Sequence, residues 1–172
     1  ERVYSLTLGV SGRYVVWNGV QVIRSESGYR TVNAMYVYDL ITHTERLLPT
    51  GHRAEIPWHQ LDPAISGERI VWVDNRHMTY GSCYDPDCNA EIYLFDLATN
   101  IERRITTNPE PQWNPAISGA RIVWTDFRHT RLPVTQESPA IIRSPNTDIY
   151  LFDLTTNTEQ EVTTDPWSQR DP

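Results

Sequence analysis

The sequence predicts an all-β protein made of three copies of one repeat, and three observations support that prediction. One block centred on Val/Ile-Val-Trp and another of the form Tyr-x-x-Asp-Leu each occur three times in the 172 residues. β-Branched and aromatic residues, which favour extended backbone, fill both blocks. The i, i+3, i+4 spacing of apolar residues that marks an amphipathic helix does not occur over any useful length.

The first block predicts two strands joined by a tight turn. Segment 63–77 returns nearly unchanged as 115–129, and a weaker copy covers 8–17. In each copy a Ser-Gly pair separates a short strand from a strand ending near Trp, and glycine can adopt the positive φ of a tight turn. The tryptophans are Trp17, Trp72 and Trp124, spaced 55 and 52 residues apart.

The second block predicts a third strand, at 35–40, 92–97 and 149–154. This strand is apolar on both faces, as expected for a strand packed between two neighbouring sheets. A turn such as Ala98-Thr99-Asn100 leads into an amphipathic fourth strand, at 102–106, suited to a sheet edge. Four-stranded antiparallel units with a period of 50–57 residues are typical of the blades of a β-propeller.

The repeat also divides the chain into parts of one partial propeller domain. We assign 1–59 to blade 1, 60–111 to blade 2, 112–168 to blade 3 and 169–172 to the start of a further blade. The last segment, Gln169-Arg170-Asp171-Pro172, matches the openings at 60–63 and 112–115. Propellers typically have about 4–8 blades, so we expect the ring to be completed by remaining blades of a longer polypeptide or by a second copy.

Composition excludes several classes of function. The net charge is −7, and all 15 cationic residues are arginine. Without lysine, Schiff-base chemistry and Walker-type phosphate binding are excluded, and the acidic balance argues against a dedicated nucleic-acid binder. No apolar run approaches the roughly 18–20 residues of a membrane-spanning helix. Nine Tyr and 6 Trp against 3 Phe fit half-buried sheets better than a thick aliphatic core.

The repeat resembles a known family. Blades that read Pro-Ala-Ile-Ser-Gly-x-Arg-Ile-Val-Trp-x-Asp-x-Arg, then Ile-Tyr-Leu-Phe-Asp-Leu and Arg-Ile-Thr, resemble TolB-like β-propeller repeats. They look most similar to the tandem form in bacterial and archaeal secreted or cell-surface proteins, and the resemblance covers essentially the whole chain. It implies a six- or seven-bladed ring in a periplasmic, secreted or surface-attached protein. Such propellers act as protein-binding modules or as gating domains of peptidases, so the resemblance alone does not fix the activity.

Repeated charged residues are the most conspicuous candidates for chemistry. An Asp-x-Arg motif follows the second strand as Asp74/Arg76 and again as Asp126/Arg128. It is compatible with an acid site or a carboxylate-binding arginine. Because the motif recurs with the blade, we interpret it as scaffold in which each arginine pairs with its neighbouring aspartate. By the same reasoning the repeated aspartates after the third strand cap turns, and these are Asp39, Asp96 and Asp153.

The two cysteines, Cys83 and Cys88, flank an Asp-Pro-Asp turn. A small disulfide-closed loop is feasible there, and a disulfide would fit an extracytoplasmic location. A metal site would need more ligands than this pair supplies.

Catalytic and metal motifs are missing from the sequence. The histidines are His43, His52, His59, His77 and His129. His52 and His59 flank Glu55 on a proline-containing loop, which is not the helix of a zinc peptidase. His77 and His129 follow the repeated arginines and would meet near one face of the ring. Nucleophile-elbow and phosphate-loop motifs do not occur, so we expect no catalytic residue, cofactor or metal in this chain.

Long connections between the second and third strands carry the candidate binding residues. They cover 18–33, 77–90 and 130–147 and would emerge on one face of the ring. Tyr and Arg are enriched at interfaces. The candidates are Tyr29, Arg30, Tyr80, Tyr84, Arg131 and Arg143, with Arg24 and Met78 nearby. The alternative is that these connections are merely tolerated length, since loop insertions cost little stability.

The sequence therefore predicts a non-catalytic, extracytoplasmic propeller module that binds a protein or a cell-surface component through loops on one face. One alternative is an accessory propeller of a secreted hydrolase or peptidase whose catalytic domain lies outside this sequence. A second is a carbohydrate-binding propeller, although no repeated Trp-Asn-Asp pocket motif occurs in the connections.

Overall fold

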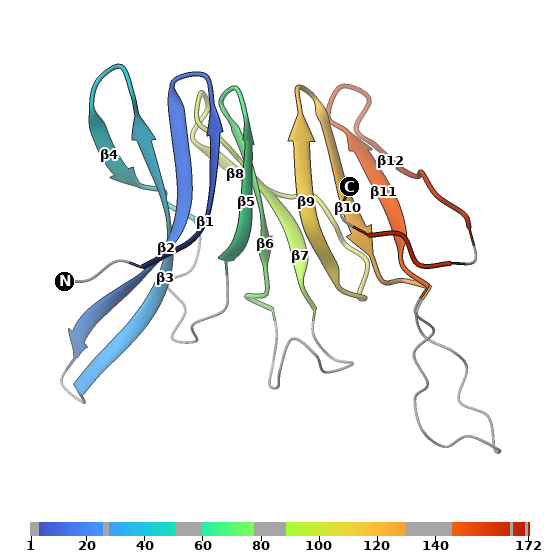
Figure 1. The fold of residues 1–172 in the computed structure, drawn as a ribbon, viewed down its shortest axis with the longest axis horizontal. Helices are drawn as coiled ribbons and strands as arrows, with labels where there is room; N and C mark the ends of the chain where they lie inside the picture. The colour runs from blue at the N-terminus through green and yellow to red at the C-terminus, as the bar shows by residue number, and fades with distance from the viewer. Residues whose placement is uncertain are drawn as a thin grey trace.

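The fold consists of three four-stranded antiparallel sheets. The sheets follow one another in chain order across the molecule (Figure 1). The computed structural model describes residues 4–25, 28–50, 60–77, 89–129, 146–165, 167–170 and 172. Within these ranges there is no helix, and so no helix that could cross a membrane. The predicted all-β propeller class is confirmed.

Each sheet uses four strands that are consecutive in the chain, and we call the sheets blades 1 to 3. Blade 1 contains β1 (Tyr4–Ser11), β2 (Tyr14–Ser25), β3 (Gly28–Asp39) and β4 (Thr44–Leu47). Blade 2 contains β5 (Gln60–Ser66), β6 (Arg69–Asp74), β7 (Glu91–Asp96) and β8 (Ile101–Arg104). Blade 3 contains β9 (Gln112–Ser118), β10 (Arg121–Asp126), β11 (Asp148–Asp153) and β12 (Thr158–Glu161).

The turns between the first and second strands use glycine for a conformational reason. Gly12, Gly67 and Gly119 have φ values of 55°, 61° and 58°. This left-handed region costs an ordinary L-residue roughly 1–2 kcal/mol, whereas glycine adopts it freely.

The turns between the third and fourth strands are capped by carboxylates. Asp96 Oδ1 accepts hydrogen bonds from the Ala98 and Thr99 backbone N–H groups at 2.9 and 3.0 Å. Asp39 and Asp153 accept equivalent bonds in the other blades. The three repeated aspartates therefore lie in the turns where capping was expected.

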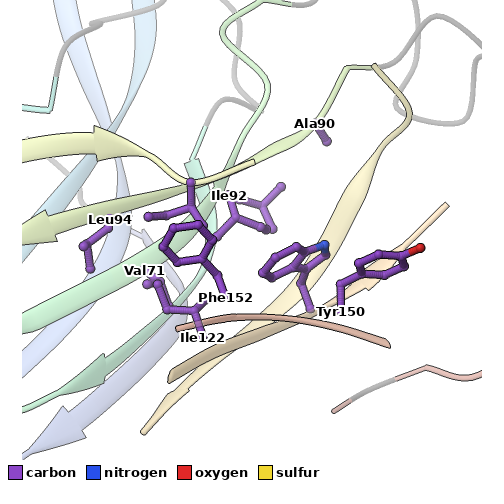
Figure 2. Close-up of a cluster of buried hydrophobic side chains, with 10 residues drawn as sticks. Val71, Ala90, Ile92, Leu94, Ile122, Tyr150 and Phe152 are labelled. Carbon is purple, nitrogen blue, oxygen red and sulfur yellow. The ribbon is translucent and has the colours of Figure 1, made fainter. Parts of the chain in front are cut away.

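The core lies between the blades. The second and third strands of blade 2 present one face to each neighbouring blade, which explains why they are apolar on both faces. Figure 2 shows Val71, Ile92 and Leu94 of blade 2 gathered against Ile122 and Phe152 of blade 3. A matching cluster between blades 1 and 2 contains Val16, Met35, Val37, Leu48, Ile70, Trp72, Tyr93 and Phe95.

The first strands also join neighbouring blades. β1 packs against β5, and β5 packs against β9. Ser11 Oγ accepts a hydrogen bond from the Gly67 N–H, and Ser66 Oγ accepts one from the Gly119 N–H, both at 2.9 Å. The serines of the repeated Ser-Gly turns therefore connect each blade to the next, a role that turn chemistry alone does not predict.

One expected loop is instead a continuous hairpin. Residues 18–33 were expected to form a long connection, but β2 and β3 remain paired from Tyr14↔Asp39 to Ser25↔Gly28. In blades 2 and 3 the second strand ends where an aspartate side chain accepts the backbone N–H of the arginine two residues later. Blade 1 has Gly19 at the position of Asp74 and Asp126, so this strand-ending turn is not available and pairing continues.

Candidate functional site

One edge of the three blades brings together the charged motifs and the projecting hairpin. We call it the connection edge: β6 and β10 end there, and β7 and β11 begin there. Figure 1 shows the hairpin of β2 and β3 projecting beyond the blades at the same edge. Both hairpin strands have 12 residues, against 6 in each of the equivalent strands of blades 2 and 3.

In blade 2 the Asp-x-Arg motif is part of a closed network of charges. Asp74 accepts the Trp72 indole N–H at 2.9 Å and pairs with the Arg76 guanidinium at 2.6 Å. Arg76 also binds Glu102 at 2.7 Å and lies 4.2 Å from the centre of the Tyr93 ring. Both unit charges of the motif are therefore matched within the blade.

Blade 3 repeats this network with little change. Asp126 accepts the Trp124 indole N–H at 2.9 Å and pairs with Arg128 at 2.7 Å. Arg128 binds Glu159 at 2.9 Å and lies 3.7 Å from the centre of the Tyr150 ring. Burial alone would lower the pKa of Arg128, but its hydrogen bonds and charge interactions with these carboxylates outweigh burial and raise it. The arrangement fixes the end of β10 and offers no proton at neutral pH.

Blade 3 adds a second group of polar residues beside this network. His129 Nδ1 lies 2.9 Å from Asp148 Oδ2 and 3.7 Å from Glu161 Oε1. One ligand atom from each residue falls within 4.8 Å of the others. The side chain of Asp148 is 2% exposed, whereas those of His129 and Glu161 are 46% and 31% exposed. These are residue types that bind metal ions, although the sequence led us to expect no metal ligands.

At the positions equivalent to Asp148 and Glu161, blade 2 has a carboxylate and an arginine. Glu91 faces Asp74 across the strands, as Asp148 faces Asp126. Arg104 faces Tyr93, as Glu161 faces Tyr150. Arg104 forms an ion pair with the buried Glu91. Burial raises the pKa of Glu91, and the nearby Arg104 guanidinium partly offsets that rise.

The histidines of the two blades also differ in their contacts. His77 Nε2 lies 3.0 Å from the Tyr93 hydroxyl, whereas the His129 ring faces Asp148. In blade 3 the Tyr150 hydroxyl interacts with Glu161, and burial raises the pKa of Tyr150 to about 12. The Asp-x-Arg network is thus the same in blades 2 and 3, whereas the polar residues beside it differ.

Of the predicted binding residues, Tyr29 is described most fully. It is 79% exposed on β3 and lies opposite the exposed Arg24 of β2. Arg30 lies next to it in β3, but its side chain is outside the described residues. The remaining candidates also lie outside them, and these are Tyr80, Tyr84, Arg131, Arg143, Met78, the cysteines Cys83 and Cys88, and the histidines His52 and His59.

Sequence reasoning missed two sets of residues. Glu102 and Glu159, which bind the motif arginines, sit at matching positions in fourth strands that we examined only as amphipathic edges. Asp148 and Glu161 were also missed. Aligning the blades residue by residue would have shown Glu161 replacing Arg104, a reversal of charge at one position.

Comparison with known proteins supports the fold and leaves the activity open. No protein-family profile matches this sequence, and no curated protein matches it by sequence. Among solved structures, TolB from Acinetobacter baumannii is similar with a TM-score of 0.56 and 16% identity, over 94% of this chain and 33% of that one.

Two peptidase structures are similar to the same degree. The β-propeller domain of the Trilobed protease from Pyrococcus furiosus matches with a TM-score of 0.57 and 14% identity, over 93% of this chain and 43% of that one. The acylaminoacyl peptidase of Pyrococcus horikoshii matches with a TM-score of 0.55 and 11% identity, over 94% and 25% of the two chains. This chain thus spans less than half the length of each of the three.

The three blades and these structural similarities together define the fold of the chain. The chain has a TolB-like β-propeller fold, represented here by three blades.

Proposed function

We propose that this chain is a non-catalytic, extracytoplasmic propeller module that binds a protein or cell-surface partner through its connection edge. The observation that carries the proposal is the hairpin of β2 and β3, which extends two paired strands beyond the blades. Its tip places Tyr29 opposite Arg24, both exposed. Tyrosine and arginine are the residue types that most often dominate binding energy at interfaces.

The charge networks support a module rather than an enzyme. The motif carboxylates Asp74 and Asp126 are buried and matched by arginines, so neither offers a free acid or base. Chemical groups placed for catalysis usually have perturbed proton affinities and open access to a substrate. In the repeated motif the arginine and aspartate pair with each other within each blade, and Asp74 and Asp126 are each 1% exposed, so neither carboxylate is open to a substrate.

An accessory propeller attached to a hydrolase is the second candidate. The structural similarity to propellers from two peptidases favours it. In that case the connection edge would contact a catalytic domain of the same polypeptide, and the same hairpin would mediate an intramolecular interface.

Site-specific photocrosslinking tests the proposal. A benzophenone amino acid is introduced at Tyr29 of the full polypeptide in its native host, with Leu40 as the matched control. Leu40 is 44% exposed in the turn after β3, at the opposite end of that strand. We expect position 29 to form a discrete crosslinked product that excess purified chain competes away, and position 40 not to form it.

The crosslinked product also separates the two candidates. A crosslink to a separate protein or envelope component supports the binding module, whereas a crosslink to a catalytic domain of the same polypeptide supports the accessory propeller. Equal products from both positions, or none from position 29, would contradict binding through the connection edge.

A further inference from the structure

Blade 3 carries three metal-ligating side chains where blade 2 carries an ion pair. From this difference we propose that blade 3 binds one divalent transition-metal ion through His129, Asp148 and Glu161. The site is separate from the hairpin of blade 1, so it does not depend on the function proposed above.

The geometry of the three residues suits a single ion. Ligands bound 2.0–2.1 Å from a tetrahedral zinc ion lie about 3.3 Å from one another. The separations of His129 Nδ1 from Asp148 Oδ2 and Glu161 Oε1, 2.9 and 3.7 Å, fall on either side of that value. All three ligand atoms lie within 4.8 Å of one another, and the 31% exposed side chain of Glu161 has room to move closer to the other two.

The charges around the site are mainly negative, so a bound cation would be stabilised there. Replacing Arg104 of blade 2 by Glu161 at the equivalent position exchanges a positive charge for a negative one. Arg128, the nearest guanidinium of the motif, already binds Asp126 and Glu159. Two carboxylates therefore lie within 4.8 Å of each other beside a histidine, where blade 2 has one carboxylate and its arginine.

Asp148 provides an independent sign that a ligand belongs here. The residue is 1% exposed, and its Oδ1 has no hydrogen-bond partner among the described residues. A buried carboxylate oxygen without a donor is costly, and an ion bound through both oxygens of Asp148 would offset that cost. Its other oxygen, Oδ2, already points to His129.

The donor set indicates the kind of metal. Calcium and magnesium prefer oxygen ligands alone, whereas an imidazole nitrogen with two carboxylates suits zinc and related transition metals. The three residues come from the turn after β10, from β11 and from β12. An ion would join these elements at the connection edge and leave a coordination position for solvent or a further ligand.

Calorimetric titration of the metal-stripped chain with zinc chloride tests the proposal. We expect one zinc ion per chain, and at least a tenfold loss of affinity in Glu161→Arg and in Asp148→Asn. Glu161→Arg is the sharper variant because it restores the residue that blade 2 uses. Glu45→Gln, in an exposed strand of blade 1, is the matched control and should bind zinc like the unmodified chain.

Cobalt(II) distinguishes this site from the cysteines. A nitrogen and oxygen ligand set gives visible d–d bands, whereas ligation by Cys83 or Cys88 adds a thiolate-to-metal charge-transfer band. We expect d–d bands without charge transfer, lost in Glu161→Arg. A thiolate band, or spectra identical in the variant and the unmodified chain, would overturn the assignment.

Folding controls keep the test decisive. Circular dichroism and the thermal unfolding temperature establish that each variant retains the blades. If Glu161→Arg fails to fold, Glu161→Gln removes one anionic ligand without adding a charge, and it should show the same loss of affinity. Failure of the unmodified chain to bind zinc, or unchanged affinity in a folded Glu161 variant, would refute the site.

Discussion

At the scale of single residues, the Asp-x-Arg networks show how one carboxylate serves several purposes. Asp126 ends β10 by accepting the Arg128 backbone N–H, neutralises the Arg128 guanidinium and satisfies the buried Trp124 indole. A buried residue with several partners is costly to remove, because each partner is left without its acceptor.

We therefore expect Asp126→Ala to lower the free energy of unfolding by about 3 kcal/mol, near the low end of the range for breaking a buried ion pair. The matched control is Glu159→Gln, at the 31% exposed partner of the same arginine, which should cost less than about 1 kcal/mol. Urea denaturation of both variants measures the difference. Equal losses would show that the indole and backbone bonds of Asp126 contribute little.

The buried Glu91 makes stability depend on pH. Burial raises its pKa, although Arg104 opposes the rise. A group with a raised folded-state pKa contributes stability below its unfolded pKa and loses it as pH rises through the folded value. We expect Glu91→Gln to remove a fall in unfolding free energy with rising pH in the mildly acidic range.

Urea denaturation at a series of pH values checks this expectation, with the exposed Glu45→Gln as the control. An unchanged pH profile in Glu91→Gln would show that Arg104 fully compensates the burial of the carboxylate.

At the scale of elements, the sequence predicted strands well and one connection badly. The four strands of each blade follow from β-branched and aromatic residues and from the repeated turn residues. The prediction for residues 18–33 is wrong because it treats them as a connection of the same kind as 77–90 and 130–147. The informative difference is a single residue, Gly19, which cannot form the carboxylate turn that ends β6 and β10.

The His129 group was missed for a related reason. Its residues come from β11, β12 and the turn after β10, and only the register of the sheet brings them together. Motif spacing along the chain does not show such a group. The Asp-x-Arg pairing, in contrast, is local in sequence, and the structure has the expected pair in both blades.

We expect the distal part of the β2–β3 hairpin to be unnecessary for folding. This distal part begins beyond the pair Gly19↔Ala34, whereas Val16, Met35 and Val37 on the proximal side belong to the core cluster shared with blade 2. Replacing it with a two-residue Asn-Gly turn joins the paired residues Gly19 and Ala34. We expect the unfolding free energy to change by less than about 1 kcal/mol, because a two-stranded hairpin without a third strand is at best marginally stable and adds little to the blade.

The same variant should lose the crosslinked product expected at Tyr29, measured by comparing binding of the partner to the two chains. A large loss of stability would instead assign the distal hairpin a structural role.

At the scale of the whole molecule, each blade covers the face of the one before it. Ile65 and Ile117 pack against the core clusters shared with the preceding blades. Val10, the equivalent residue in blade 1, is 64% exposed, as is Leu8 at 68%. We propose that a further blade covers this face, contributed by the same polypeptide or by a second copy. Sedimentation measured over a range of concentrations separates these alternatives, because only a second copy makes the mass depend on concentration.

The serine-to-glycine bonds give a test of how blades are joined. We expect Ser66→Ala to lower the unfolding free energy of this chain by about 1 kcal/mol, the usual worth of one hydrogen bond. Ser118→Ala, at the exposed equivalent position in blade 3, should change it by less than about 0.5 kcal/mol. Thermal and urea unfolding measure both, and equal effects would contradict a role between blades.

These bonds also have a direction. The hydroxyl acceptor always belongs to the earlier blade and the amide donor to the later one. Blade 3 therefore presents an acceptor, Ser118, to whatever follows it, and blade 1 presents a donor, Gly12, to whatever precedes it. A neighbour turned upside down would place amide N–H against amide N–H at one of these contacts, and two donors cannot form a hydrogen bond. We therefore expect a unit that completes the ring to join head to tail, in the same sense as these three blades.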